Sequence, residues 1–285
     1  MDASPDLTRV LLATDLSEET VMTMPLATAK LTLATMRARH GFKAVARPLL
    51  TAPDENVKLT HSETDRVYAY GLSLSPAGSS GWQVCRYRTC GCEAVCLATS
   101  GKGAFSTTQR ARVWKTQLLA ESPVAFLRVL VSELDRVGSK VPGKLATGWS
   151  VSLRLNVLSD LPWEAIAPWI LTRAAAAGIR VYDYTKWPTA RRSGAAGLGY
   201  DLSESVNERS TDADIIGARR PVVVFSTKRG SALPTSYLGR PVVDGDRSDA
   251  RFLDPAGCVV GLRFKQVTTG TVADGLASGF VRKAA

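Results

Sequence analysis

Four of the chain's five cysteines fall close together, at Cys85, Cys90, Cys92 and Cys96. Thiolates are the ligands that soft metal centres prefer, so this spacing predicts a metal site. Four, one and three residues separate the cysteines, and no second pair follows to close a zinc tetrahedron. An iron–sulfur cube has its irons at separate corners and accepts thiolates from one winding segment. We therefore expect a [4Fe–4S] cluster, with zinc or a role without metal as alternatives.

Polar residues in the second half of the chain could act beside such a centre. They follow or end predicted strands, and in parallel α/β folds ligands bind beyond the carboxyl ends of the strands. Each has a structural alternative, because Asp160 could cap a helix, Arg154 could pair with Asp183, and Lys186 could be a solvated cation. The candidate catalytic residues are Arg154, Asn156, Asp160, Asp183 and Lys186.

Two other patterns indicate less chemistry. Asp244, Asp246, Asp249 and Asp254 form an acidic group among arginines, but the calcium-loop pattern is absent. These residues are therefore expected to form turns and salt bridges. Serine-hydrolase chemistry is disfavoured because the chain has no G-x-S-x-G motif and only two histidines.

Strand-like and helix-like stretches alternate along the chain, which predicts βαβ units. We expect an α/β fold with a mostly parallel sheet or partial barrel and a cysteine-rich loop after its first strand. Residues 1–66 are expected to form a partly flexible segment that packs on a single cluster-binding domain at residues 67–285. Predicted strands cover 67–74, 149–157, 179–184, 200–206 and 221–225, and predicted helices cover 25–37, 106–119, 161–177 and 210–218. Further β structure is expected near residues 242–243 and 258–264.

Helix starts are predicted from capping residues. Ser106 with Gln109 forms a capping-box pattern, and Ser122 precedes Pro123 at a favourable first-turn position. Asp160 and Ser210 are the expected caps of the next two helices.

Composition bounds the class of protein. No run approaches the ~20 apolar residues needed to cross a bilayer, and the N-terminus lacks a secretory pattern. We therefore expect a cytosolic protein, in which thiols stay reduced and clustered cysteines favour metal over disulfides. The net charge of +10 allows contact with nucleic acid, although the positive residues are spread along the chain.

Several blocks of sequence, in order, resemble the actinobacteriophage "gene product eighty-eight" family, a phage family of poorly established function. The resemblance covers roughly residues 68–282 and is fairly specific. Its blocks include residues 70–77, 85–97, 101–103, 110–116, 154–164, 182–186, 239–246 and 251–255.

The resemblance implies which cysteines act as ligands. In the family pattern the positions of Cys85, Cys92 and Cys96 recur as cysteine, whereas that of Cys90 is usually another small residue. Cys90 is then a spare thiol or a fourth ligand particular to this chain. Three ligands would leave one iron open, where it could act as a Lewis acid.

Three functions follow as hypotheses. The leading one is a phage-type iron–sulfur hydrolase, esterase-like, acting on a small-molecule substrate in the cytosol of the bacterial host. The second is a nucleic-acid-associated phage protein in which the cluster is structural. The third is radical chemistry dependent on S-adenosylmethionine, against which the cysteine spacing counts.

Overall fold

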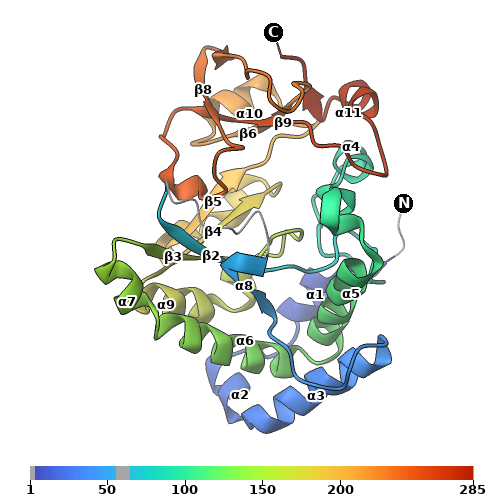
Figure 1. Ribbon diagram of the computed structural model, residues 1–285, viewed down its shortest axis with the longest axis vertical. Helices are drawn as coiled ribbons and strands as arrows, with labels where there is room; N and C mark the ends of the chain where they lie inside the picture. Colours follow the sequence, from blue (N-terminus) through green and yellow to red (C-terminus); the bar gives the residue numbers. More distant parts are fainter. Residues whose placement is uncertain (1–3, 56–64, 285) are drawn as a thin grey trace.

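Two five-stranded sheets form the framework of the protein (Figure 1). The computed structural model describes residues 4–55 and 65–284. The first sheet has the order β1–β2–β3–β4–β5 and is parallel except at β1. Its strands are β1 (Leu50–Thr51), β2 (Val67–Leu72), β3 (Ser150–Arg154), β4 (Ile179–Thr185) and β5 (Tyr200–Glu204).

The second sheet has the order β10–β6–β9–β8–β7 and is parallel except at β7. A parallel bridge between Ser205 and Val222 connects it to the end of β5. The predicted α/β fold with mostly parallel strands is confirmed, although the strands form two sheets. The second sheet comprises β6 (Val222–Phe225), β7 (Ser236–Tyr237), β8 (Arg240–Asp244), β9 (Val259–Arg263) and β10 (Val281–Arg282).

Helices between residues 7 and 176 cover the first sheet and enclose the largest core (Figure 1). In α6, Phe126, Leu127, Leu130, Val131 and Leu134 recur every three or four residues, which places them on one buried face. The helices are α1 (Leu7–Leu12), α2 (Glu18–Thr23), α3 (Leu26–Arg39), α5 (Ser106–Glu121), α6 (Pro123–Gly138), α7 (Val141–Ala146), α8 (Trp163–Ile166) and α9 (Pro168–Ala176).

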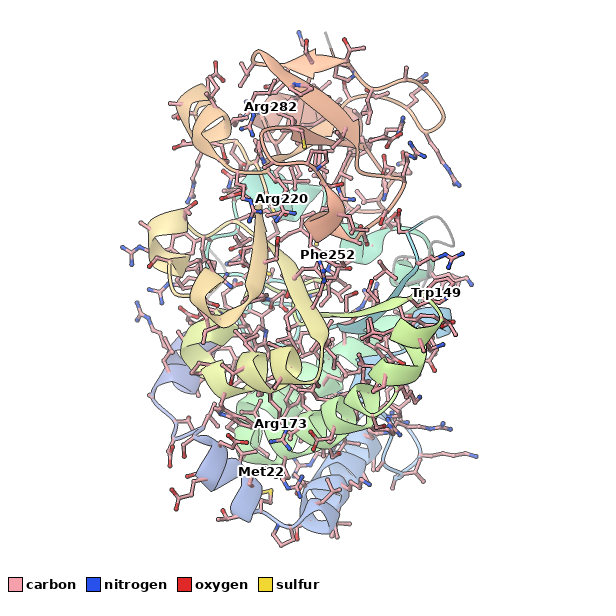
Figure 2. The ribbon with its side chains drawn as sticks, turned by 90° about the vertical axis from the view of Figure 1, so that its left-hand side faces the viewer. Met22, Trp149, Arg173, Arg220, Phe252 and Arg282 are labelled. Atoms are coloured by element: carbon pink, nitrogen blue, oxygen red, sulfur yellow. The ribbon has the colours of Figure 1, made fainter. Side chains whose placement is uncertain are left out.

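The N-terminal segment contributes to this core. Leu7, Leu11 and Leu33 are fully buried, and α1 and α2 are helical where we expected little order. Arg173 of α9 ties the layer together, because it pairs with Asp135 of α6 and with Glu18 of α2 (Arg173 is labelled in Figure 2). The polar stretch at residues 52–66 is predicted from the sequence to be a loop, and most of it lies outside the described residues.

The predicted helix over residues 161–177 is wrong in its extent. Pro168 lacks the N–H that a helix interior needs, and the chain forms α8 and α9 with a break at Ala167. The predicted cap is also wrong, because the residue before α8 is Pro162 and Asp160 bonds elsewhere.

Two further caps differ from the prediction. Ser106 is the first residue of α5, and its capping box with Gln109 does not form. The helix α10 (Asp212–Gly217) is capped by Thr211 rather than Ser210, in a capping box with Asp214. Ser122 does precede α6, with Pro123 in the first turn, but its side chain makes no cap bond.

The two sheets meet through buried polar and aromatic contacts. Arg220, at the start of β6, bonds to Asp201 of β5 and to the carbonyl of Arg251. Phe252 packs edge-on against Tyr182 of β4, with ring centroids 5.2 Å apart. Figure 2 labels Arg220 and Phe252 in this middle region. Within the described chain, no helix is both long and apolar enough to cross a bilayer.

Candidate metal and substrate site

The cysteine-rich segment follows β2, the first parallel strand. Cys85 lies in the loop, Cys92 lies in the short helix α4 (Cys90–Ala94), and Cys96 follows its end. Thr89 caps this helix, since its hydroxyl accepts from the Cys92 N–H at 3.2 Å. The local fold therefore places Cys92 in a short helix, with Cys85 before it and Cys96 after it, beside the carboxyl ends of the strands.

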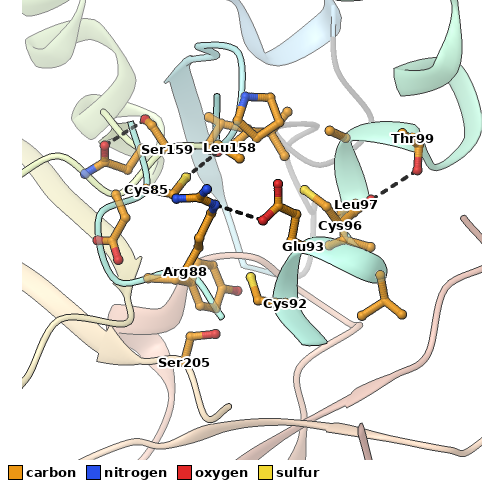
Figure 3. Close-up of a pocket in the computed structure, with 18 of the residues that line it drawn as sticks. Cys85, Arg88, Cys92, Glu93, Cys96, Leu97, Thr99, Leu158, Ser159 and Ser205 are labelled. Carbon is orange, nitrogen blue, oxygen red and sulfur yellow. Dashed lines mark hydrogen bonds and ion pairs between the residues drawn. The ribbon is translucent and has the colours of Figure 1, made fainter. Parts of the chain in front are cut away.

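Three of the four clustered cysteines line one cavity of about 420 Å³. They are Cys85, Cys92 and Cys96, and Figure 3 shows their sulfurs around the same space. The Cys85 thiol donates to the Leu158 carbonyl at 3.5 Å. Cys90 is exposed and does not belong to the cavity lining. The cavity volume is in the range typical of small-molecule sites.

Four of the five predicted catalytic residues also line this cavity, and the fifth lies behind it. The residues on the cavity are Arg154, Asn156, Asp160 and Lys186. They reach it from β3, from the loop after β3 and from the end of β4. Asp183 is fully buried and supports the others from the interior. The expectation that the strand ends gather these side chains is thus met for four of them.

Asp183 and Asn156 serve the framework. The Asp183 carboxylate accepts from the backbone N–H groups of Leu155 and Asn156, from the Tyr200 hydroxyl at 2.7 Å, and from Arg154. Burial raises the pKa of Asp183 to about 6, although Arg154 opposes that rise. The side-chain amide of Asn156 binds the loop that follows it, because its oxygen accepts from the Ser159 hydroxyl and from the Leu161 N–H.

Asp160 anchors the ends of two segments. Its carboxylate accepts from the Lys186 N–H at 2.8 Å and pairs with buried Arg192 at 3.3 Å. Burial raises the pKa of this carboxyl, and Arg192 pulls in the opposite direction. Arg192 also pairs with Glu164 of α8.

Lys186 presents its ammonium to the cavity. The Nζ atom donates to Ser205 Oγ at 3.1 Å, and Figure 3 labels Ser205 near Cys92. Burial disfavours this charge, but Cys92, Asp160 and Cys85 outweigh burial and hold the pKa of Lys186 above its ordinary value. Lys186 is therefore a cation on the cavity wall, bonded to Ser205, rather than a fully solvated loop residue.

Other charged residues of the cavity were not singled out from the sequence. Arg88 and Glu93 form an ion pair at 2.9 Å, and Figure 3 draws it between Cys85 and Cys96. Arg112 donates to the carbonyls of Ala98 and Gly103. The spacing of Arg88 and Glu93, five apart across the cysteine segment, was the available signal.

The acidic group forms salt bridges, as expected. Asp244 and Asp246 both pair with Arg263, and Asp254 pairs with Arg251. Asp249 reaches the cavity lining, where it accepts from Tyr184 and pairs with Arg154, each at 3.3 Å.

The thiols that line the cavity are ligands that zinc and iron–sulfur clusters both accept. In the ranges 4–55 and 65–284, no three His, Cys, Asp or Glu side chains lie close enough to hold one metal ion. The three thiols and Lys186 line the same cavity. Burial raises the pKa of the Cys85 thiol to about 12, so ligation would release its proton.

The fold and the site define an α/β protein with three thiols on a cavity at the strand ends, lined by apolar and charged side chains. The sequence matches the family described as Gene product 88 over residues 44–284, and the chain therefore belongs to that family. Searches among curated proteins and among solved structures gave no significant match.

Proposed function

We propose that this protein binds a [4Fe–4S] cluster through Cys85, Cys92 and Cys96 and acts as a hydrolase in the cytosol of the bacterial host. The observation that carries the proposal is that these three thiols, and not Cys90, line one ligand-sized cavity. When bound by three thiolates, such a cluster offers an open iron as a Lewis acid toward a carbonyl or a water.

The chain's own residues would bind and orient the ligands. The Lys186 ammonium balances thiolate charge and can donate to an anionic oxygen in the cavity. Arg112 lies beside Cys96, fixed by two carbonyls. In both cases the cation is already in place, which favours an anionic group on the substrate.

Ester hydrolysis is the reaction we assign to this site. Water adds to the ester carbonyl carbon, the bond from carbon to the alkoxy oxygen breaks, and a proton of the water passes to the departing oxygen. We assign the role of holding that proton to Asp160, the carboxylate of the predicted set that lines the cavity. Lys186 is the matching donor to the carbonyl oxygen.

The cluster is tested by anaerobic purification with iron and sulfide analysis and electron paramagnetic resonance. We expect about four irons and four sulfides in the wild type and in Cys90→Ala, and loss of both in Cys92→Ala. Cys90 and Cys92 are matched because both lie in α4. Zinc without sulfide in the wild type would show that the cysteines form a zinc site and hold no cluster.

The reaction is tested separately with the loaded protein. A panel of small esters should be hydrolysed by the wild type and at least a hundredfold more slowly by Lys186→Met. Lys265→Met is the control, because Lys265 lines the same cavity but pairs with Asp246. If no ester is hydrolysed and S-adenosylmethionine is cleaved under reducing conditions, the protein is a radical enzyme and the hydrolase proposal is wrong.

A nucleic-acid role is the second candidate, and the net charge of +10 is what favours it. It predicts binding of DNA or RNA that weakens steeply as salt is raised. Binding that does not respond to salt, or no binding at 50 mM salt, would exclude this role.

A further inference from the structure

A single carboxylate holds the chain on both sides of Cys90. Glu208, in the loop after β5, accepts from the Thr89 hydroxyl at 2.6 Å through Oε2 and from the Gly91 N–H at 2.7 Å through Oε1. Hydrogen bonds to an ionised carboxylate are stronger than neutral ones. Glu208 lies more than a hundred residues further along the chain, so these contacts join the cysteine helix to the C-terminal half.

The same turn is seated against α11 (Val272–Ser278) and β10. A Cβ atom added at Gly91 would lie 2.5 Å from Ser278 Oγ and 2.9 Å from the Cβ atom of Phe280. Gly91 is buried, whereas its neighbour Cys90 is exposed and does not belong to the cavity lining. The two residues that flank Cys90 are therefore fixed, while Cys90 itself is exposed and lies outside the lining that the other three thiols share.

We infer that Glu208 is a positioning residue that keeps Cys90 out of the ligand set and so leaves the fourth position of the site open. Only Gly91 separates Cys90 from Cys92, so a turn freed from Glu208 can rotate Cys90 toward the cavity. Four cysteines would close the cluster and remove the open iron. The inference rests on the proposed cluster, but the clamp itself can be measured without it.

The test is a footprint of cysteine alkylation by iodoacetamide, measured at each cysteine by mass spectrometry. In the loaded wild type, we expect Cys90 to react at least tenfold faster than Cys85, Cys92 and Cys96. In Glu208→Gln, Cys90 should become as protected as the other three. Adding Cys90→Ala to that variant should restore the resonance spectrum of the wild type.

Asp214→Asn is the matched control for the loss of a clamping carboxylate. Asp214 also accepts from a threonine hydroxyl and a backbone N–H, both of Thr211, at 2.7 and 2.8 Å. It lies on α10 and does not line the cavity. This variant should retain the wild-type footprint. Two results would overturn the inference. One is protection of Cys90 in the loaded wild type, and the other is equal reactivity of Cys90 in the loaded wild type and in the loaded Glu208→Gln variant.

A second measurement keeps the clamp testable if no cluster forms. Equal alkylation of all four cysteines in the reconstituted wild type would reject the proposed cluster and leave the clamp untouched. Amide hydrogen exchange at Gly91 in the metal-free protein should then be at least tenfold faster in Glu208→Gln than in the wild type. Unchanged exchange would overturn the clamp, and Thr89→Ser, which retains the hydroxyl, should exchange like the wild type.

Discussion

At the scale of single residues, some polar side chains around the cavity hold the fold, and others line the cavity itself. The polar atoms of Asp183 and Asn156 form hydrogen bonds with backbone groups and with Tyr200. Lys186 bonds to Ser205 and lines the cavity. A buried polar atom without a partner is costly, so the framework residues are satisfied internally and the functional ones face the cavity.

Asp183→Asn should destabilise the protein by roughly 3 kcal/mol, because it breaks a buried ion pair and turns an amide NH₂ toward N–H donors. Its partner Arg154 is buried as well. The control is Asp135→Asn, which removes an exposed partner of Arg173 and should cost less than about 1 kcal/mol. Urea unfolding measures both, and equal losses would contradict the framework role of Asp183.

Lys115 gives a pH dependence far from the cysteines. Its Nζ donates to the Leu49 carbonyl at 2.6 Å, and burial lowers its pKa to about 8 from 10.5. Between these values the unfolded chain binds a proton that the folded chain has released, so stability rises with pH. Relative to Lys115→Met, the free energy of unfolding should increase by up to ~1.4 kcal/mol per pH unit from about pH 8 to 10.5. Parallel curves for the two proteins would show that Lys115 stays charged.

At the scale of elements, what could be predicted depended on how local the signal is. The strands at residues 67–74 and 179–184 and the helix at 25–37 were predicted because their patterns are local, and β2, β4 and α3 confirm them. The helix at 161–177 was overextended although Pro168 was a visible warning.

The site divides in the same way. The four clustered cysteines could be assigned to one region because they lie on one short segment, and the family resemblance singled out Cys85, Cys92 and Cys96 among them. Asp249 reaches the cavity from a distant position, while Glu208 and Arg192 bond to Gly91 and Asp160 beside it. A single sequence carries no signal for such contacts. Asp160 illustrates the limit, because a residue suited to cap a helix is taken by Arg192 and by the Lys186 N–H.

Gly270 is expected to fix the seat of the cysteine helix. A Cβ atom there would lie 2.4 Å from the carbonyl oxygen of Ala94, which is backbone and cannot turn aside. Gly270→Ala should therefore destabilise the protein by about 1–3 kcal/mol and reduce its iron content. Gly217→Ala is the control, since a Cβ at Gly217 meets nothing within 4 Å. Calorimetry and iron analysis on both variants test this prediction. Equal stability and equal iron content in the two variants would mean that α4 can shift away from Gly270.

At the scale of the whole molecule, the cavity draws its walls from both sheets. Asn156 follows β3 of the first sheet, whereas Val224 and Leu262 belong to β6 and β9 of the second. The Ser205–Val222 bridge and the pair of Arg154 with Asp249 cross between them. A ligand in this cavity would therefore stabilise both sheets together.

Because these contacts are buried, residues 67–285 should unfold as one cooperative unit. Amide exchange under increasing urea tests this, since amides of Leu153 in β3 and Val223 in β6 should converge on the same free energy of opening. Arg220→Met removes the bonds of Arg220 to Asp201 and to the Arg251 carbonyl, and should lower the opening energy of the second sheet first. If amides of β6 and β9 exchange at lower urea than those of β3 already in the wild type, the two sheets are separate unfolding units. The cavity, whose walls come from both sheets, would then open when the sheets separate.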